Sequence, residues 1–203
     1  MWKSCKNKRS YLTGFLKLIV KIKSFIFKTI LSSNKPTFGK KVKLRQPVLF
    51  LGNGKIKLGD RVRIGYFPSA YFFSTYGHFE TRDENSSITI GANTMINNNS
   101  NIVAEKESIE IGQNCYIGQN FKCYSSDFHG IKKEDRNNPE KIKTAPVIIG
   151  NDVFIGNDVT ILKGVIIGDG CVIGAGSVVT KNIPANTIAC GNPAKVIKNI
   201  DKT

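Results

Sequence analysis

The chain is poor in histidine, and its few cysteines lack the spacing of a metal site. Only two histidines occur in 203 residues, His78 and His129, so a metal site built from three histidines is excluded. The cysteines form an odd set without a CxxC pair or a secretory leader: Cys5, Cys115, Cys123, Cys171 and Cys190. This pattern favours reduced thiols in a cytoplasmic protein, and no metal is expected.

Acidic residues are almost absent from the N-terminal part. Residues 1–63 contain seventeen Lys and Arg but a single acidic residue, Asp60, which gives them a formal charge of +16. The remaining 140 residues carry thirteen basic and fourteen acidic groups and are nearly neutral. The excess of +15 over the whole chain is therefore a property of the N-terminal part alone.

Residues 11–31 are predicted to form an amphipathic helix. Lys17, Lys21, Ser24 and Lys28 fall on one face, and apolar residues occupy most of the rest. Such a helix suits the surface of an anionic membrane, and its lysines argue against a membrane span. The alternative is a helix packed on the end of the main domain or on a neighbouring subunit. No nucleic-acid partner is expected, because the aromatics are not interleaved with the basic residues.

A strict six-residue repeat dominates the C-terminal half. Aliphatic residues recur without a slip at Ile149, Ile155, Ile161, Ile167, Ile173 and Val179. Glycine follows four of these positions and permits a tight corner, while a second small or apolar residue usually lies two positions earlier. Each unit is thus a short strand plus a corner, and three units make one triangular coil of a solenoid.

Weaker copies of the repeat extend upstream, so the solenoid covers most of the chain. We expect a basic N-terminal helix in residues 1–35, a β-helix in 36–184 and a C-terminal cap in 185–203. Two long loops are expected, at about 66–86 and 124–145. Long excursions from a compact repeat are more often functional than idle.

Each long loop contains one of the two histidines, and His129 is the stronger candidate for catalysis. It follows a solenoid edge directly, so the base of its loop is held by a rigid wall. Histidine is the usual proton acceptor for a hydroxyl or amine nucleophile. Asp127 or a nearby carbonyl would fix the tautomer of the ring and leave its other nitrogen free. His78 receives no role.

The repeat from residue 146 onward, PVIIGNDVFIGNDVTILKGVIIGDG, resembles the hexapeptide-repeat acyltransferases, and it is similar to galactoside and maltose O-acetyltransferases. The phrase SSDFHGI at 125–131 resembles the sugar and polysaccharide O-acetyltransferases of capsule and lipopolysaccharide clusters. This resemblance implies an all-β, left-handed parallel β-helix, in the form of a homotrimer. It also implies acetyl transfer from acetyl-CoA to a sugar hydroxyl, with no metal.

The resemblance also assigns roles to individual residues. His129 would be the general base, and Asn97 would contact the acceptor and orient the site. Phe154 stands where relatives usually carry tryptophan, so the wall of the pantetheine channel lacks an indole donor. The remaining contacts to coenzyme A would come from backbone amides and from basic side chains near the C-terminus: Gly156, Asn157, Ala175, Gly176, Lys181, Lys195 and Lys198.

Other functions stay open at this level. An N-acetyltransferase acting on an amino sugar nucleotide would use the same base. An acidic acyl carrier protein is a rival donor, since a basic N-terminus attracts it. A non-catalytic β-helix binding module is the alternative outside the enzymes. The preferred interpretation is an O-acetyltransferase for a cell-surface polysaccharide or its precursor, at the inner face of the cytoplasmic membrane.

Overall fold

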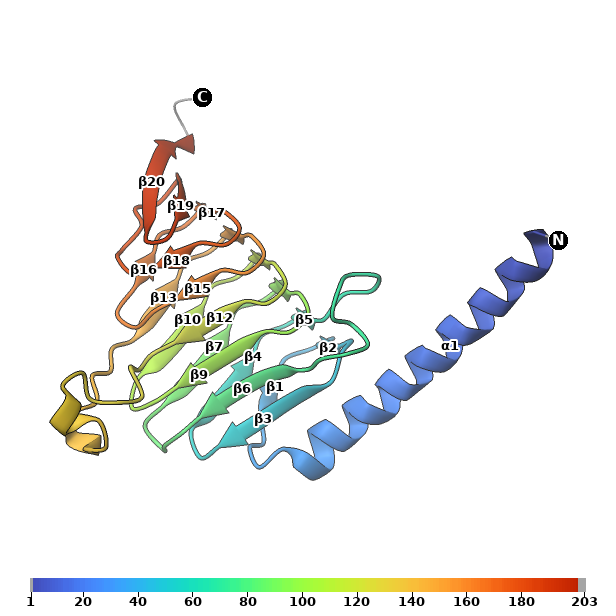
Figure 1. Cartoon of the computed structure of the whole chain (residues 1–203), viewed down its shortest axis with the longest axis horizontal. Helices are drawn as coiled ribbons and strands as arrows, with labels where there is room; N and C mark the ends of the chain where they lie inside the picture. The colour runs from blue at the N-terminus through green and yellow to red at the C-terminus, as the bar shows by residue number, and fades with distance from the viewer. Residues whose placement is uncertain (1, 201–203) are drawn as a thin grey trace.

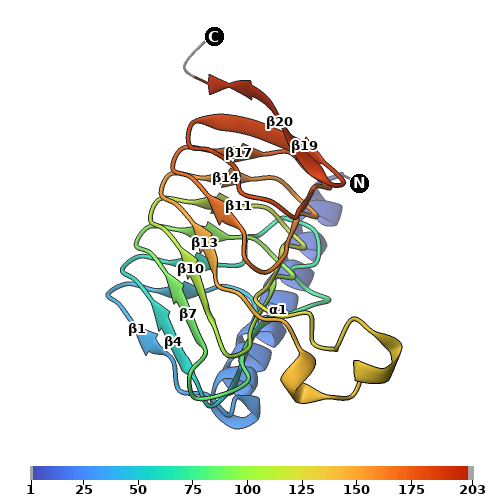
Figure 2. The same cartoon turned by 90° about the vertical axis from the view of Figure 1, so that its left-hand side faces the viewer.

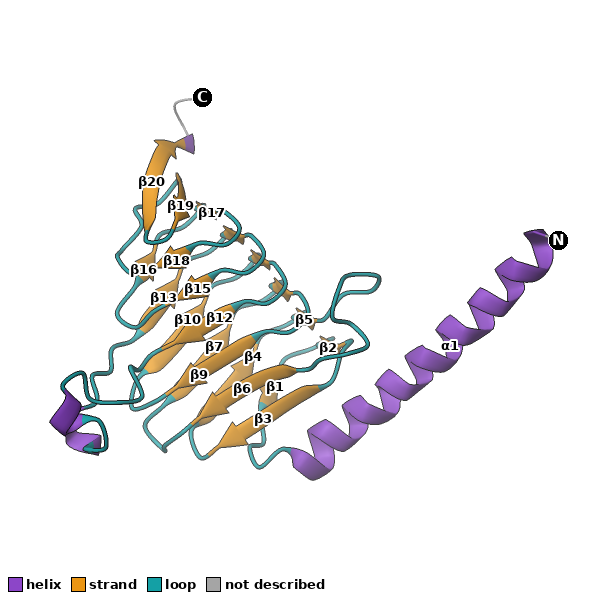
Figure 3. Cartoon of the chain, viewed as in Figure 1, coloured by secondary structure: helices purple, strands orange, loops and turns teal. Residues whose placement is uncertain are grey.

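Three sheets of parallel strands wind into a three-sided solenoid that narrows toward the C-terminus (Figure 1). The computed structural model describes residues 2–200, with side chains for residue 11 and for residues 13–200. From β1 to β19, strands that follow one another along the chain lie in different sheets, and each pairs in parallel with the strand one coil away; β20 instead pairs antiparallel with β19 in one sheet. The short strands and many corners of this arrangement are visible in Figure 3.

The strands form walls of six, eight and six strands. Sheet A contains β1 (Thr37–Phe38), β4 (Lys55–Leu58), β7 (Ser87–Ile90), β10 (Ser108–Ile111), β13 (Val147–Ile149) and β16 (Ile166–Ile167). Sheet B contains β2 (Lys43–Leu44), β5 (Arg63–Ile64), β8 (Met95–Ile96), β11 (Tyr116–Ile117), β14 (Phe154–Ile155), β17 (Val172–Ile173), β19 (Thr187–Gly191) and β20 (Ala194–Asn199). Sheet C contains β3 (Val48–Gly52), β6 (Gly77–Thr81), β9 (Asn101–Ala104), β12 (Lys122–Tyr124), β15 (Thr160–Ile161) and β18 (Val178–Val179).

The six-residue repeat positions form the core, as the sequence predicts. Ile149 pairs with Ile167 in sheet A, and Ile155 pairs with Ile173 in sheet B. These side chains are at most 1% exposed, so stacked coils bury one another's inward residues. Successive repeat positions thus face the same interior from three different walls.

Tight stacking at the corners requires glycine at defined positions. A Cβ atom on Gly112 would lie 2.4 Å from the carbonyl oxygen of Gly150 in the next coil. Backbone approaches backbone there, so no side chain fits without moving a coil. The glycines after the repeat positions therefore set the coil spacing at this edge.

The expected loop at 66–86 is shorter than predicted. Strand β6 (Gly77–Thr81) occupies its second half and pairs along its whole length with β3. The strand lacks the Ile-Gly pattern of the repeat, and its inward position holds Phe79, whose ring lies edge-on to Phe50 at 5.7 Å. An aromatic pair replaces the aliphatic stack at this level, which is why the six-residue pattern missed the strand. The observed excursion runs from residue 65 to 76, at the edge between sheets B and C.

The second excursion leaves the opposite side of sheet C. It joins β12 to β13 at the edge between sheets C and A, and it contains two short 3₁₀ helices, η2 (Lys133–Asp135) and η3 (Pro139–Lys141). In Figure 2 this segment projects away from the solenoid wall. The long loop predicted at 124–145 is therefore present.

The N-terminal helix extends from the base of the solenoid. It comprises α1 (Trp2–Ile26) followed by a π-helical turn, η1 (Phe27–Leu31), and its N-terminus lies far from the coils (Figure 1). Two exposed lysines of the helix contact aromatic rings of the solenoid: Lys17 Nζ lies 4.0 Å from the Phe67 ring centre, and Lys28 Nζ lies 4.7 Å from that of Phe38. The C-terminal part of α1 thus contacts the base of the solenoid, whereas its N-terminal end extends away from it (Figure 1). Among residues 2–200, no helix combines the length and apolarity needed to cross a bilayer.

Candidate active site

The loop that carries His129 is anchored where it leaves and re-enters the solenoid. The amide of Ala145 donates to the Ser125 carbonyl at 2.9 Å, and that of Asp127 donates to the Lys143 carbonyl at 3.1 Å. Ser126 and Thr144 form an isolated antiparallel bridge between these bonds. The two ends of the loop therefore close on each other, and His129 lies just beyond the closure.

The ring of His129 has one nitrogen engaged and is otherwise exposed. Its Nδ1 lies 3.1 Å from the backbone carbonyl oxygen of Arg136. A carbonyl oxygen only accepts hydrogen bonds, so Nδ1 carries the proton of the neutral ring and Nε2 is left with a free lone pair. The ring is thus held in the tautomer that a general base acting through Nε2 needs.

Asp127 does not hold this ring. Its carboxylate lies 2.8 Å from Lys163 Nζ, which extends from the same edge one coil further along. Of the two expected partners for His129, a carbonyl fills the role and the carboxylate does not. Asp127 instead ties the loop to the solenoid through a partly exposed ion pair.

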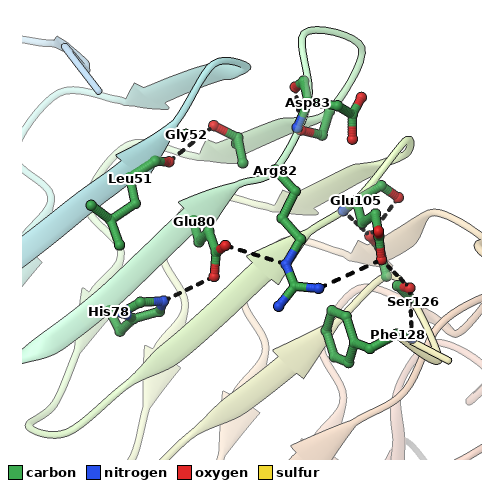
Figure 4. A network of polar contacts seen from close by, with 12 residues as sticks. Leu51, Gly52, His78, Glu80, Arg82, Asp83, Glu105, Ser126 and Phe128 are labelled. Carbon is green, nitrogen blue, oxygen red and sulfur yellow. Dashed lines mark hydrogen bonds and ion pairs between the residues drawn. The ribbon is translucent and has the colours of Figure 1, made fainter. Parts of the chain in front are cut away.

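A polar network on the outside of sheet C supports the loop (Figure 4). Arg82 Nε donates to Glu80 at 3.2 Å, and its other end lies 3.9 Å from Glu105. Glu105 accepts a hydrogen bond from Ser126 Oγ at 2.5 Å. The same hydroxyl oxygen accepts the amide of Phe128 at 2.9 Å. The network therefore links sheet C to the residue that precedes His129.

Phe128 has an unusual backbone for a large residue. Its φ of 61° lies in the left-handed region, which disfavours bulky side chains. Contacts on both sides keep it there: the Tyr124 ring lies 5.6 Å away, and Arg82 Cζ lies 4.4 Å from the Phe128 ring centre. These contacts hold in place the residue that precedes His129.

Sequence reasoning missed Arg82 and Glu105. The number of residues in each coil could have identified them, because it sets which residues align between coils. Glu80 pairs with Val103, and Val103 in turn pairs with Tyr124. Two residues beyond each of these aligned positions stand Arg82, Glu105 and Ser126. Side chains at equivalent points of successive coils stack on one edge, so a charged pair there was predictable once the register was known.

The expected donor-binding residues lie on other parts of the solenoid. Phe154 is 52% exposed on sheet B, and Asn157 and Gly176 lie at the edge between sheets B and C, bonded through the Gly176 amide and the Asn157 carbonyl. Gly156 and Ala175 pack together at the same edge, since a Cβ on Gly156 would lie 2.6 Å from the Ala175 amide nitrogen. This edge is not the one that carries His129, so one protomer does not bring the two sets together.

Asn97 lies at the same edge as the residues expected to bind the donor, between β8 and β9. Its side-chain nitrogen donates to Ser69 Oγ at 3.2 Å, and its Oδ1 accepts the amide of Asn98 at 2.8 Å. Asn97 thus anchors the 65–76 excursion at the edge between sheets B and C. The amide is half-buried and already engaged on both sides.

The three lysines expected to meet coenzyme A phosphates are exposed and separate. Lys181 follows β18, whereas Lys195 and Lys198 lie on β20 of the antiparallel C-terminal hairpin that β19 and β20 form. The hairpin adds to sheet B, next to the column of strands that carries Phe154. Lys195 and Lys198 therefore share a wall with Phe154, and Lys181 lies at the edge between sheets C and A.

The buried thiols are poor nucleophiles. Burial raises the pKa of Cys123 far above its ordinary value and also raises the pKa of Cys115. Cys123 is an inward residue of sheet C, paired with Ile102 and Ile161. Among residues 11 and 13–200, whose side chains are described, no three His, Cys, Asp or Glu are grouped so as to hold a metal ion.

Comparison with known proteins agrees with this architecture. Residues 146–181 match the family described as bacterial transferase hexapeptide (six repeats). The galactoside O-acetyltransferase of Escherichia coli (strain K12) is 42% identical over 134 residues, which cover 66% of this chain and 60% of that enzyme. The chain thus matches less than two thirds of that relative's length.

Solved structures show the same fold. The polySia-specific acetyltransferase NeuO superposes with a TM-score of 0.59 at 26% identity, over 83% of this chain and 77% of that one. A hexapeptide-repeat acetyltransferase of Vibrio cholerae, solved with acetyl coenzyme A, gives a TM-score of 0.57 at 22% identity, over 92% of this chain and 88% of that one. The predicted left-handed parallel β-helix with an N-terminal helix is confirmed.

Proposed function

Because residues 146–181 match the hexapeptide-repeat transferases, we propose that the chain transfers acetyl from acetyl-CoA to a hydroxyl of a sugar. The acceptor would be a cell-surface polysaccharide or its precursor. The sugar-directed relatives, a galactoside enzyme and a polysialic acid enzyme, support this class of acceptor. The observation that carries the proposal is the bond from His129 Nδ1 to the Arg136 carbonyl.

The chemistry needs one base and good alignment. Acetyl-CoA supplies an activated thioester, so the protein has to orient the acceptor and remove one proton. His129 Nε2 takes the hydroxyl proton as the oxygen bonds to the acetyl carbonyl carbon. The bond to sulfur then breaks, and the proton leaves His129 for the departing thiolate. No covalent intermediate on the protein is required.

We propose that two copies of the chain complete each site. His129 stands at the edge between sheets C and A, whereas Phe154, Asn157 and Gly176 lie on sheet B and at the edge between sheets B and C. A site that uses both sets has to be shared between neighbouring solenoids. A ring of three copies with head-to-tail contacts closes such an arrangement and gives three equivalent sites.

The membrane is the proposed place of action. Glycan precursors linked to lipid lie at the inner face of the cytoplasmic membrane, and the basic N-terminal part would hold the enzyme there. This peripheral attachment extends the function but is not needed for the chemistry. A soluble acceptor would still be acetylated.

Purified full-length protein, acetyl-CoA and a panel of glycans test the proposal. We expect acetyl incorporation that mild alkali removes, since an O-acetyl ester is labile and an N-acetyl amide is not. His129→Ala should lower kcat by about 10²- to 10⁴-fold, whereas the matched variant His78→Ala should retain activity. An active His129→Ala protein would remove the assigned base, and an alkali-stable product would indicate an amino acceptor.

A further inference from the structure

The outward face of the N-terminal helix is apolar and uncovered. Tyr11, Phe15, Leu18, Ile22 and Phe25 follow one another at spacings of four, three, four and three, so they form one continuous stripe. Their exposed fractions range from 52% to 78%. We call these five residues the apolar stripe.

The opposite face of the helix is the one that packs on the solenoid. Val20 is 4% exposed there, and Lys17 and Lys28 lie over the rings of Phe67 and Phe38. The rotation of the helix is therefore fixed by its own contacts. It directs Val20 inward and the apolar stripe outward, while Lys17 and Lys28 stay exposed beside the contact with the solenoid.

A cluster of cations lies beside this helix on the outside of sheet B. Lys41, Lys43, Arg61 and Arg63 surround a depression of about 550 Å³, and Lys43 is paired in register with Arg63. Arg61 Nε donates to Asn93 Oδ1 at 2.6 Å. Within the described part of the chain, none of the four side chains forms an ion pair. We call these four residues the basic cradle.

The apolar stripe adjoins the basic cradle at its C-terminal end, through Phe25. Phe25 and Lys41 line the same depression of about 450 Å³ between the helix and the first coil. Lys21 and Lys43 line a second depression of about 580 Å³. Exposed rings and unpaired cations thus adjoin at the base of the solenoid, where β2 and β5 lie (Figure 1).

We infer that this surface docks on a bilayer containing anionic phospholipid, with the apolar stripe inserted among the acyl chains and lipid phosphates in the basic cradle. Four adjoining cations without carboxylate partners repel one another, and phosphate oxygens relieve that repulsion. An apolar helix face beside cations is the pattern of an interfacial helix. The inference rests on the proposed membrane attachment and specifies the surface that makes it.

Charge argues against a second copy of this chain as the occupant. Residues 1–63 carry a formal charge of +16, and a symmetric contact through the apolar stripe would bring two basic cradles together. The rest of the chain carries fourteen acidic and thirteen basic groups, so its net charge of −1 cannot balance the +16 of the N-terminal part. An anionic lipid surface satisfies both the apolar and the basic parts.

Cosedimentation of the full-length protein with vesicles tests the inference. The vesicles contain phosphatidylcholine alone or mixed with phosphatidylglycerol. We expect binding to the mixed vesicles, weakened by salt. Phe15→Ser with Ile22→Ser should weaken it by about a hundredfold, and Lys43→Gln with Arg63→Gln by about tenfold. All four positions are on the surface, so circular dichroism and acetyl transfer to a soluble sugar should be unchanged.

Matched controls separate this surface from net charge and general hydrophobicity. Lys55→Gln with Lys57→Gln removes the same charge from the outside of β4, and Ile166→Ser removes an apolar side chain from the outside of β16. Both should leave binding within about twofold of the wild-type value. Equal weakening by the Lys55 and Lys57 pair would overturn the role of the basic cradle.

Three outcomes would overturn the inference in distinguishable ways. Absence of any vesicle binding, with acetyl transfer intact, removes both the membrane attachment and its surface but not the enzyme. Binding that survives Phe15→Ser with Ile22→Ser but is lost in Lys17→Gln with Lys28→Gln keeps the attachment and assigns it to the lysine face. If the Phe15 and Ile22 pair instead changes the mass measured by light scattering and leaves vesicle binding intact, a second copy covers the apolar stripe.

Discussion

The guanidinium carbon of Arg82 lies 4.4 Å from the centre of the Phe128 ring, and the same side chain reaches Glu80 and Glu105. One residue thereby joins three points of the structure: β6, the end of β9, and the residue before His129. Because Phe128 has a left-handed backbone, a loss of this contact allows it to relax and to carry His129 with it.

Replacing Arg82 should therefore impair catalysis more than it impairs binding. We expect Arg82→Ala to lower kcat by about tenfold to a hundredfold, since a small displacement of a base has a large effect. Arg82→Lys should recover only part of this, because lysine lacks the planar group that stacks on the ring. The KM for acetyl-CoA should be unchanged in both variants. Arg136→Ala is the control, because it keeps the carbonyl that holds His129.

The Asp127–Lys163 ion pair should matter little for the chemistry. Its two side chains are 30% and 26% exposed, and it ties the loop to the wall without touching the His129 ring. We expect Asp127→Asn and Lys163→Gln each to keep activity within about threefold, with a double variant no worse than the single ones. If Asp127→Asn behaved like His129→Ala, the carboxylate would be the group that orients the ring.

The aromatic pair in sheet C should carry much of the stability of the first coils. Phe79 is fully buried and lies edge-on to Phe50. We expect Phe79→Ala to lower the free energy of unfolding by about 3–5 kcal/mol, through lost burial and the cavity that remains. Urea denaturation followed by circular dichroism measures this. Ile166→Ala, at a position that is 46% exposed, should cost less than about 1 kcal/mol.

Buried thiols should make the fold sensitive to alkali. Burial raises the pKa of Cys123 in the folded state, so above about pH 9 the unfolded chain releases a proton that the folded chain retains. Stability contributed by the neutral thiol is complete below the unfolded pKa and declines as the pH rises beyond it. We expect the urea midpoint to fall between about pH 8.5 and 10.5, and Cys123→Ala to fall less steeply. Parallel slopes for the two proteins would contradict this.

Most of the architecture was predictable from the sequence because every six-residue unit has to meet the same packing requirements. Each strand has an inward aliphatic residue, and each corner has little room for a side chain. Ile155 followed by Gly156 therefore indicates both a strand and the corner after it. Strand β6 was not predicted, because the aromatic rings of Phe79 and Phe50 fill the core at this level in place of aliphatic side chains. A six-residue pattern of aliphatic residues therefore finds the strands that contain them and misses a strand with an aromatic core residue.

The candidate site was predictable only in part. His129 stood out because histidine is scarce and because a long loop contains it. The sequence did not identify Arg136 as the residue whose carbonyl holds the ring, because a backbone carbonyl is present in every residue whatever its side chain. Arg82 and Glu105 depend on the number of residues per coil, which the loops obscure. The orientation of α1 depends on contacts with Phe38 and Phe67 that periodicity does not encode.

The antiparallel direction of β20 limits the extension of the solenoid by strands of another molecule. Every other strand of sheet B runs parallel to its neighbours, whereas β20 returns against β19. A further rung from another molecule would have to meet a strand of the wrong polarity, and it would meet one that ends in exposed lysines. End-to-end polymerisation into a filament is thus discouraged at the narrow tip, and the solenoid keeps a finite length.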